Sequence, residues 1–279
     1  MALSQRIAFV GAGNMASALI EGLLAAGTCV AERITASDVR EDALAALRGK
    51  HGISTSQDNA ALAATADVVV LSVKPQVLPA VLVALGPVLD ARKLVLSIAA
   101  GVPLSVIEAS LPSGARAVRA MPNTPALVRA GATAIAAGTY ATGADMDVAE
   151  AIFRSVGVVE RVPETQLDAV TALSGSGPAY VFLLCEALTD AGISVGLSAS
   201  TAAVLAAQTV YGAGKLLHES AEGPAALRAR VSSPGGTTVA GLERLAKRDF
   251  AGVVADAVRR ATERAQELGI AAATKLGKG

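Results

Sequence analysis

Residues 7–16 of the chain read IAFVGAGNMA, in which a short apolar run leads into two glycines and then into a helix-forming segment. The apolar run predicts a buried strand over residues 6–10, and the segment after Gly13 predicts a helix over residues 14–26. A glycine turn between a strand and a helix matches the G-x-G-x-x-G/A pattern of dinucleotide-binding proteins.

Three positions of this motif have distinct physical roles. Gly11 would make the tight turn, Gly13 would let the backbone approach a pyrophosphate, and Ala16 would let the helix pack closely on the strand. The free N–H groups at the start of the helix would then face the phosphates. A purely structural glycine turn is the alternative, but the flanking strand and helix favour dinucleotide binding.

Outward from this motif, short strand-like runs alternate with helical stretches. The expected strands are residues 6–10, 34–37, 68–72, 94–97, 117–119, 132–135 and 158–162, and the expected helices are residues 14–26, 40–51, 58–64 and 102–111. This alternation is typical of a parallel sheet covered by helices. It predicts an α/β fold, a Rossmann-type doubly wound parallel sheet, over residues 1–162.

After Pro163 the alternation stops, and Ala- and Leu-rich helical stretches follow at residues 180–191, 199–217, 239–247 and 253–268. Residues 163–279 are therefore expected to form a second, all-helical domain. The stretch 199–217 is apolar on more than one face, so one neighbouring helix would not cover it. Either a partner subunit or the other helices of a monomeric bundle would have to do so.

Composition narrows the classes of partner. Lys and Arg total 24, as do Asp and Glu, so the chain lacks the excess positive charge typical of proteins that bind nucleic acids or anionic membranes. The longest apolar runs are shorter than the roughly 20 residues of a membrane span, and no basic, apolar leader precedes residue 7. We expect a small-molecule partner, no nucleic acid, no membrane and a cytoplasmic location.

The sequence indicates neither a metal site nor a disulfide framework. Cys29 and Cys185 lie in different halves of the chain without CxxC spacing, and His51 and His218 have no ligand-forming neighbours. No metal site is expected.

The end of the second expected strand carries residues that bear on the choice of cofactor. Asp38 lies where an acidic side chain commonly binds the adenosine ribose of NAD. Ser37 and Arg40 favour NADP instead, because a hydroxyl and a guanidinium can hold the additional phosphate. The alternatives are a helix cap for Asp38 and a solvated surface position for Arg40.

Four further segments carry polar or glycine-rich turns. Lys74 and Pro75 follow the strand at residues 68–72, at the edge where open α/β sheets bind ligands. Asn123 lies between two prolines in MPNTP, residues 121–125. Residues 173–180 read LSGSGPAY and residues 231–238 read VSSPGGTT, each beside an expected helix start. Taken singly, each turn is more often structural than functional.

Together these motifs resemble the pyrroline-5-carboxylate reductase family. GAGNMA, VKP, MPNTPALVRAGAT, LSGSGPAY and VSSPGGTT occur in one order across nearly the whole chain, which is far more specific than any one of them. The resemblance implies reduction of a cyclic imine, 1-pyrroline-5-carboxylate, to L-proline with NADPH or NADH, the last step of proline biosynthesis. It also implies a helical domain shared by a homodimer, with dimers often assembled into a decamer.

The resemblance also assigns roles to residues. The cofactor would be bound by Gly11, Ala12, Gly13, Asn14, Met15, Ala16, Ser37, Asp38, Arg40, Asn59, Val73, Lys74, Pro75 and Asn123. The substrate would be bound by Ser176, Ser233, Gly235, Gly236, Thr237 and Thr238, with Thr238 as the catalytic residue near the imine nitrogen. Asp38 stands where many relatives have a neutral residue, so the preference for NADPH over NADH stays open.

Two other classes remain. β-Hydroxyacid dehydrogenases also join this cofactor domain to a helical domain, but they use a lysine and an asparagine where this chain has Val181 and Cys185. A non-catalytic NAD(P)-binding sensor is the second alternative, and turnover distinguishes it from an enzyme.

Overall fold

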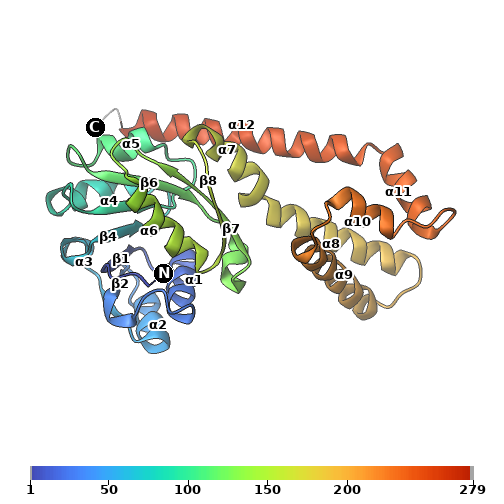
Figure 1. Ribbon diagram of the computed structural model, residues 1–279, viewed down its shortest axis with the longest axis horizontal. Helices are drawn as coiled ribbons and strands as arrows, with labels where there is room; N and C mark the ends of the chain where they lie inside the picture. Colours follow the sequence, from blue (N-terminus) through green and yellow to red (C-terminus); the bar gives the residue numbers. More distant parts are fainter. Residues whose placement is uncertain (1, 277–279) are drawn as a thin grey trace. The chain divides into compact units, whose positions relative to one another are not determined.

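The computed structural model describes residues 2–276, and its central feature is an eight-stranded sheet with the order β3-β2-β1-β4-β5-β6-β7-β8 (Figure 1). The strands are β1 (Ile7–Val10), β2 (Ile34–Ser37), β3 (Ser54–Ser56), β4 (Val68–Leu71), β5 (Leu94–Ser97), β6 (Arg116–Met121), β7 (Gly131–Ala137) and β8 (Gly157–Arg161). The strands from β3 to β6 are parallel, and β7 and β8 run opposite to them. The chain leaves β3 and returns beside β1 as β4, so β1 and β4 form the topological switch point.

Helices cover both faces of this sheet (Figure 1). They are α1 (Asn14–Ala25), α2 (Glu41–His51), α3 (Asn59–Thr65), α4 (Leu78–Leu85), α5 (Leu104–Ala109) and α6 (Gly143–Arg154). Alternate residues of β1 enter two separate apolar clusters: Ile7 and Phe9 pack with residues of α1, α2 and α6, whereas Ala8 and Val10 pack with residues of α3, α4 and α5. This division confirms the doubly wound α/β fold.

Every expected strand is present within two residues of its expected ends, and the largest differences are at the ends of β6 (Met121) and β7 (Ala137). Sequence reasoning missed β3, α4 and α6, and also two short helices, Leu167–Val170 and Pro224–Arg230. β3 is a short polar strand at the sheet edge, and α4 is too uniformly apolar to show helical periodicity. α6 did carry a usable signal, because Thr142 and Asp145 form a reciprocal capping box at its start.

The chain divides into two compact units. One contains the residues up to Ser176 together with those from Arg260 onward, and the other is Gly177–Arg259. The first unit thus extends beyond the expected boundary at residue 162 and also includes the C-terminal part of α12 (Phe250–Leu276). The first junction lies at Ser176, between a turn of π-helix and the start of α8, and α12 crosses the second without interruption. Periodicity alone does not mark a boundary inside a helix.

The second unit consists of α8 (Gly177–Ser194), α9 (Ala199–Glu219), α10 (Pro224–Arg230), α11 (Thr237–Lys247) and the first turns of α12. It buries no large apolar side chain among its described residues, and only Ala202 and Ala206 are buried. Side chains on α9 such as Val204 (68% exposed) and Tyr211 (61% exposed) face solvent. Exposed apolar surface of this extent marks a site where another protein surface or a membrane binds.

The helical stretch Glu164–Ser194 is long and apolar enough to cross a membrane by length and composition, with a mean hydropathy of 1.2 and 11% of the relevant window buried. The sequence analysis considered only uninterrupted apolar runs. It therefore did not identify this stretch, in which small residues interrupt the apolar ones. One helix of this kind is weak evidence for a membrane span, since a helix covered by a partner subunit has the same composition.

The exposure of α9 predicts that the chain is not a monomer. We expect light scattering at low micromolar concentration to show a dimer or a larger assembly, and we expect Val204→Glu to weaken that assembly because it places a charge on the apolar face. The matched control is Val30→Glu, at a valine of the first unit that is 56% exposed, which should leave the assembly intact. A monodisperse, active monomer would contradict this prediction.

Candidate functional site

The glycine turn after β1 is built around a close approach to β4. Gly11 has a φ of +102°, and a Cβ atom placed there would lie 2.8 Å from the carbonyl oxygen of Ser72. The Ser72 hydroxyl donates to the carbonyl oxygens of Val10 (3.0 Å) and Gly11 (2.7 Å). Only glycine fits this position, and Ser72 fixes the turn at the switch point.

The start of α1 is open to a ligand. Gly13 precedes the helix, and a Cβ atom there would have no neighbour within 4 Å. Within residues 2–276 no side chain caps the helix, and its first turn contains no acidic residue. The free backbone N–H groups and the positive end of the helix dipole are therefore available to an anion. Ala16 is fully buried, as its predicted packing role requires.

Asp38 connects β2 to the glycine turn. One carboxylate oxygen accepts a hydrogen bond from the backbone N–H of Ala12 (2.9 Å), and the other accepts from the backbone N–H of Arg40 (2.9 Å). Burial raises the pKa of Asp38, but the hydrogen bonds from Ala12 and Arg40 outweigh it, so the pKa lies below its ordinary value. The bond to Arg40 closes a turn just before α2, whose capping position is Arg40 itself, so the structure does not support Asp38 as a cap of that helix. The bond to Ala12 was not expected.

The other residues predicted at the adenosine end have different surroundings. Ser37 is fully buried and its hydroxyl donates to the Phe9 carbonyl (3.4 Å), so it lies within the sheet beneath the turn. Its direct contact with a cofactor stays a prediction. The Arg40 side chain is 58% exposed, and Asn59 is the first residue of α3, next to the capping residue Asp58.

The loop after β4 lies beside the glycine turn. The Val73 side chain would be 3.1 Å from a Cβ atom on Gly11, which places Val73 next to the motif. Lys74 is exposed, and its carbonyl oxygen accepts from Val77 (2.9 Å) and Leu78 (3.2 Å), which orders the start of α4.

Asn123 joins three segments. It follows β6 and is buried, with its side-chain oxygen accepting from the N–H of Ala132 (2.9 Å) and its amide nitrogen donating to the carbonyl of Ser174 (3.0 Å). Sequence reasoning expected a stiff loop that closes a ligand pocket. The structure uses both ends of this amide to tie β6 to β7 and to the segment around Ser174.

That segment contains a turn of π-helix, Thr171–Gly175, in which the N–H of Ser176 donates to the carbonyl of Thr171 (2.8 Å). Turns of this kind are frequent at functional sites. A Cβ atom on Gly175 would lie 2.6 Å from the terminal methyl of Met121, so glycine allows the turn to lie against the end of β6.

In the second unit, residues 233–238 form the turn into α11. Gly235 has a φ of +71°, the N–H of Gly236 donates to the carbonyl of Ser233 (2.9 Å), and the helix begins at Thr237. No side chain caps this start, and Thr237 and Thr238 are exposed. The predicted helix start is confirmed, and Thr238 is not a helix cap in the described part of the chain.

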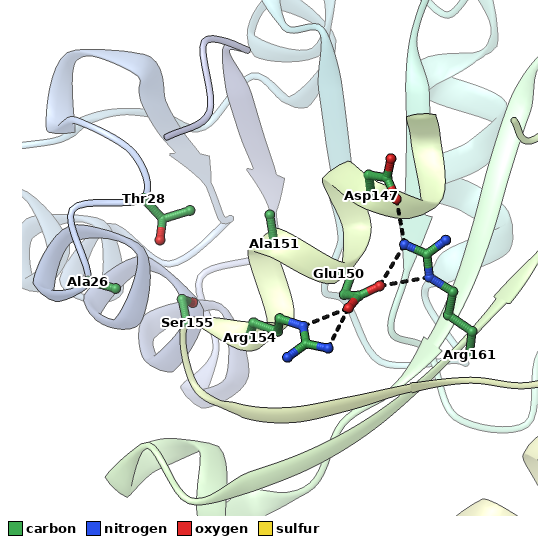
Figure 2. Close-up of a pocket in the computed structure, with 8 residues that line it drawn as sticks. All are labelled: Ala26, Thr28, Asp147, Glu150, Ala151, Arg154, Ser155 and Arg161. Carbon is green, nitrogen blue, oxygen red and sulfur yellow. Dashed lines mark hydrogen bonds and ion pairs between the residues drawn. The ribbon is translucent and has the colours of Figure 1, made fainter. Parts of the chain in front are cut away.

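A pocket of about 310 Å³ lies elsewhere in the first unit, between the end of α1, α6 and β8 (Figure 2). Its charged groups satisfy one another, because Glu150 pairs with Arg154 and Arg161 at 2.6 Å and Asp147 pairs with Arg161 at 2.6 Å. These pairs lower the pKa of Glu150. None of the predicted site residues lines this pocket, so it is not the candidate site.

Among residues 2–276, no three His, Cys, Asp or Glu side chains gather in a way that could hold a metal ion. The two cysteines are both free.

Comparison with known proteins gives matches over both parts of the chain. A family model described as pyrroline-5-carboxylate reductase dimerisation matches residues 164–268, and one described as NADP oxidoreductase, coenzyme F420-dependent, matches residues 6–101. The pyrroline-5-carboxylate reductase of Methanosarcina acetivorans is 46% identical over 95% of this chain and 98% of its own length. That of Pseudomonas aeruginosa is 47% identical over 94% and 96%.

The chain belongs to the pyrroline-5-carboxylate reductase family. Solved structures agree: the enzyme from Coxiella burnetii has a TM-score of 0.91 at 41% identity, covering 95% of this chain and 99% of its own. The Plasmodium falciparum pyrroline carboxylate reductase, solved with NADP bound, has a TM-score of 0.84 at 32% identity, covering 96% and 100%. The family resemblance drawn from the five motifs is thereby confirmed.

The hydrogen bond from Ala12 to Asp38 determines which substitution best tests the choice of cofactor. Asp38→Asn removes the negative charge and keeps an oxygen that can accept from Ala12. We expect the NADPH/NADH ratio of kcat/KM to rise at least about fivefold, since two unit charges about 4 Å apart in water interact by about 1 kcal/mol. Steady-state kinetics with both cofactors measures this ratio.

The matched control is Asp67→Asn, because Asp67 also accepts from a backbone N–H, that of Arg6 (2.8 Å), but it precedes β4 at the other edge of the sheet. Its ratio should not change. An unchanged ratio in Asp38→Asn and also in Asp38→Ser would mean that Asp38 does not face the ribose.

Proposed function

We propose that this chain reduces 1-pyrroline-5-carboxylate to L-proline with NAD(P)H, the last step of proline biosynthesis. The observation that carries the proposal is the 46% identity to a pyrroline-5-carboxylate reductase over 95% of the chain. The two family models, over residues 6–101 and 164–268, include the glycine turn of the first unit and the Ser233–Thr238 turn of the second. The uncapped start of α1 supports the cofactor part of this function.

The reaction needs one hydride at carbon and one proton at nitrogen, because the C=N bond is already present in the substrate. A bound NAD(P)H supplies the hydride. The protein's part is to hold the two molecules in reacting geometry and to stabilise the charge at nitrogen. Backbone N–H groups after Gly13 would bind the pyrophosphate, and residues 73–75 would lie beside the nicotinamide.

The turn before α11 suits the substrate. The backbone N–H of Gly236 already donates to the Ser233 carbonyl, so the donors offered to a carboxylate are the N–H groups of Gly235 and Thr237, at a helix start whose dipole stabilises negative charge. The hydroxyls of Ser233 and Ser176 would add hydrogen bonds. Thr238, in the first turn of α11, would place its hydroxyl at the imine nitrogen, where it orients the iminium or donates a proton.

We propose NADPH rather than NADH as the cofactor. The Arg40 side chain is 58% exposed and its Nε lies 3.4 Å from Asp38, so its other guanidinium nitrogens can still bind a phosphate. Asp38 opposes this preference only where its carboxylate faces the ribose, and both of its oxygens already accept hydrogen bonds from the backbone.

The assembly we propose is a homodimer through the second unit, with dimers joined into a decamer. The exposed apolar side chains of α8 and α9 support the dimer, and the dimerisation family model spans these helices. We further propose a cytoplasmic protein with no membrane or nucleic-acid partner, in which dimerisation covers the apolar stretch Glu164–Ser194.

Two competing functions make different predictions. A β-hydroxyacid dehydrogenase would need a lysine in α8 to accept the alcohol proton, and the corresponding positions are Val181 and Cys185. A sensor would bind NADPH without turnover. An NADPH oxidation assay against cyclic imines and 2-keto acids separates the three. We expect oxidation with 1-pyrroline-5-carboxylate, whereas oxidation with a hydroxyacid's keto form alone, or none at all, would overturn the proposal.

Thr238 gives the sharpest test of the substrate site. Loss of a hydrogen bond to a charged iminium costs about 1.5–3 kcal/mol, so Thr238→Ala should lower kcat/KM for the imine about ten- to hundredfold. Thr238→Ser should recover much of this loss because it restores the hydroxyl. NADPH affinity, measured by titration, should stay at the parental value in both.

A structural role predicts the opposite pattern. If the Thr238 side chain only supports the first turn of α11, its truncation would lower stability without affecting the chemical step. A Thr238→Ala enzyme that melts early and turns over at the parental rate would therefore refute the catalytic assignment.

A further inference from the structure

A buried arginine lies close to the candidate site without belonging to it. Arg119 is in β6, level with Ser97, the last residue of β5, and only 5% of it is exposed. The other buried charges of the first unit have evident structural partners: Lys93 donates to the carbonyls of Ala64 (2.9 Å) and Ala66 (2.7 Å), and Asp145 pairs with Arg116 (2.7 Å). Of these three buried charged residues, Arg119 lies nearest the edge of the sheet formed by the carboxyl ends of the parallel strands.

Arg119 pairs with two acidic residues at the entrance to the helical part of the chain. One guanidinium nitrogen lies 3.1 Å from Glu164 and another 3.7 Å from Asp168. Glu164 also accepts a hydrogen bond from the N–H of Leu104 at the start of α5 (2.6 Å). The cluster thus fixes α7 (Leu167–Val170) to β6 and to the loop after β5.

Two further residues, at the end of β6 and just after it, attach the other end of this segment to the same strand. After Arg119, Met121 lies against Gly175, and Asn123 donates to the carbonyl of Ser174. The segment from Glu164 to Ser176 is therefore fastened at both ends to one strand edge. The π-turn Thr171–Gly175 follows α7 directly, so it lies between the ion pairs at Glu164 and Asp168 and the contacts made by Ser174 and Gly175.

We propose that Arg119 is a positioning residue for the reaction. Through Glu164 and Asp168 it sets the start of α7 and thereby holds the π-turn and Ser174–Ser176 in place against the end of β6. This role rests on the proposed function, which places Ser176 at the substrate. A planar guanidinium that spans two carboxylates fixes direction as well as distance, whereas buried ion pairs as such add little stability over apolar residues of the same size.

The test compares two arginines of one strand. Arg119→Met should lower kcat/KM for the imine by about tenfold or more, since about 1 Å of misplacement can cost about a hundredfold in rate. The Kd for NADPH should stay within about twofold of the parental value. Arg116→Met is the matched control: it breaks a pair with a buried carboxylate at the other end of β6, and we expect a lower Tm with unchanged kcat/KM.

Hydrogen exchange gives a readout that does not depend on activity. In Arg119→Met, the amides of residues 171–176 should exchange faster, whereas in Arg116→Met they should not. If Arg119→Met does not fold, Asp168→Asn provides the second variant, which keeps the guanidinium and Glu164 and should show the same changes to a smaller extent.

The outcomes separate this inference from the proposed function. A parental enzyme that does not reduce the imine defeats the proposed function, while faster exchange confined to residues 171–176 still supports the structural link from Arg119. Parental kcat/KM and parental exchange in a folded Arg119→Met protein would overturn the positioning role.

Discussion

The contact on which the first unit depends is the approach of Gly11 to the end of β4. The two strands meet at the switch point with so little space that a Cβ atom on Gly11 would touch the carbonyl of Ser72. The Ser72 hydroxyl and the Asp38 carboxylate then hold the turn from its two sides. Because the turn is fixed by the protein itself, the N–H groups at the start of α1 are already aligned when an anion arrives, and little ordering remains to oppose binding.

The second constraint is that the turn proposed to bind the substrate lies on a unit without a core of large apolar side chains among its described residues. Its helices leave Val204, Leu205 and Tyr211 exposed, so their stability depends on cover from outside the described chain. A dimerisation domain meets this need, and it explains why an apolar helix as long as Glu164–Ser194 occurs in a chain that belongs to an enzyme family.

The sequence predicted the parts of this account that depend on local pattern. The glycine turn, the strands beside it and the start of α11 follow from periodicity, from glycine and from β-branched residues. The five motifs together predicted the family. What could not be predicted were contacts between residues distant in the chain. Examples are the bond from Ala12 to Asp38, the double tie made by Asn123, and the pairing of Arg119 with Glu164 and Asp168. The burial of Ser37 was also missed, since a hydroxyl at a strand end is equally consistent with either face.

The measurement that tests the central claim most directly follows the hydride. The enzyme is supplied with 1-pyrroline-5-carboxylate and with NADPH deuterated at the transferable position of the nicotinamide, and the product is analysed by mass spectrometry after chiral separation. The account predicts L-proline that carries one deuterium on the ring carbon that formed the C=N bond. NADPH oxidation without proline, or proline without deuterium, would contradict it.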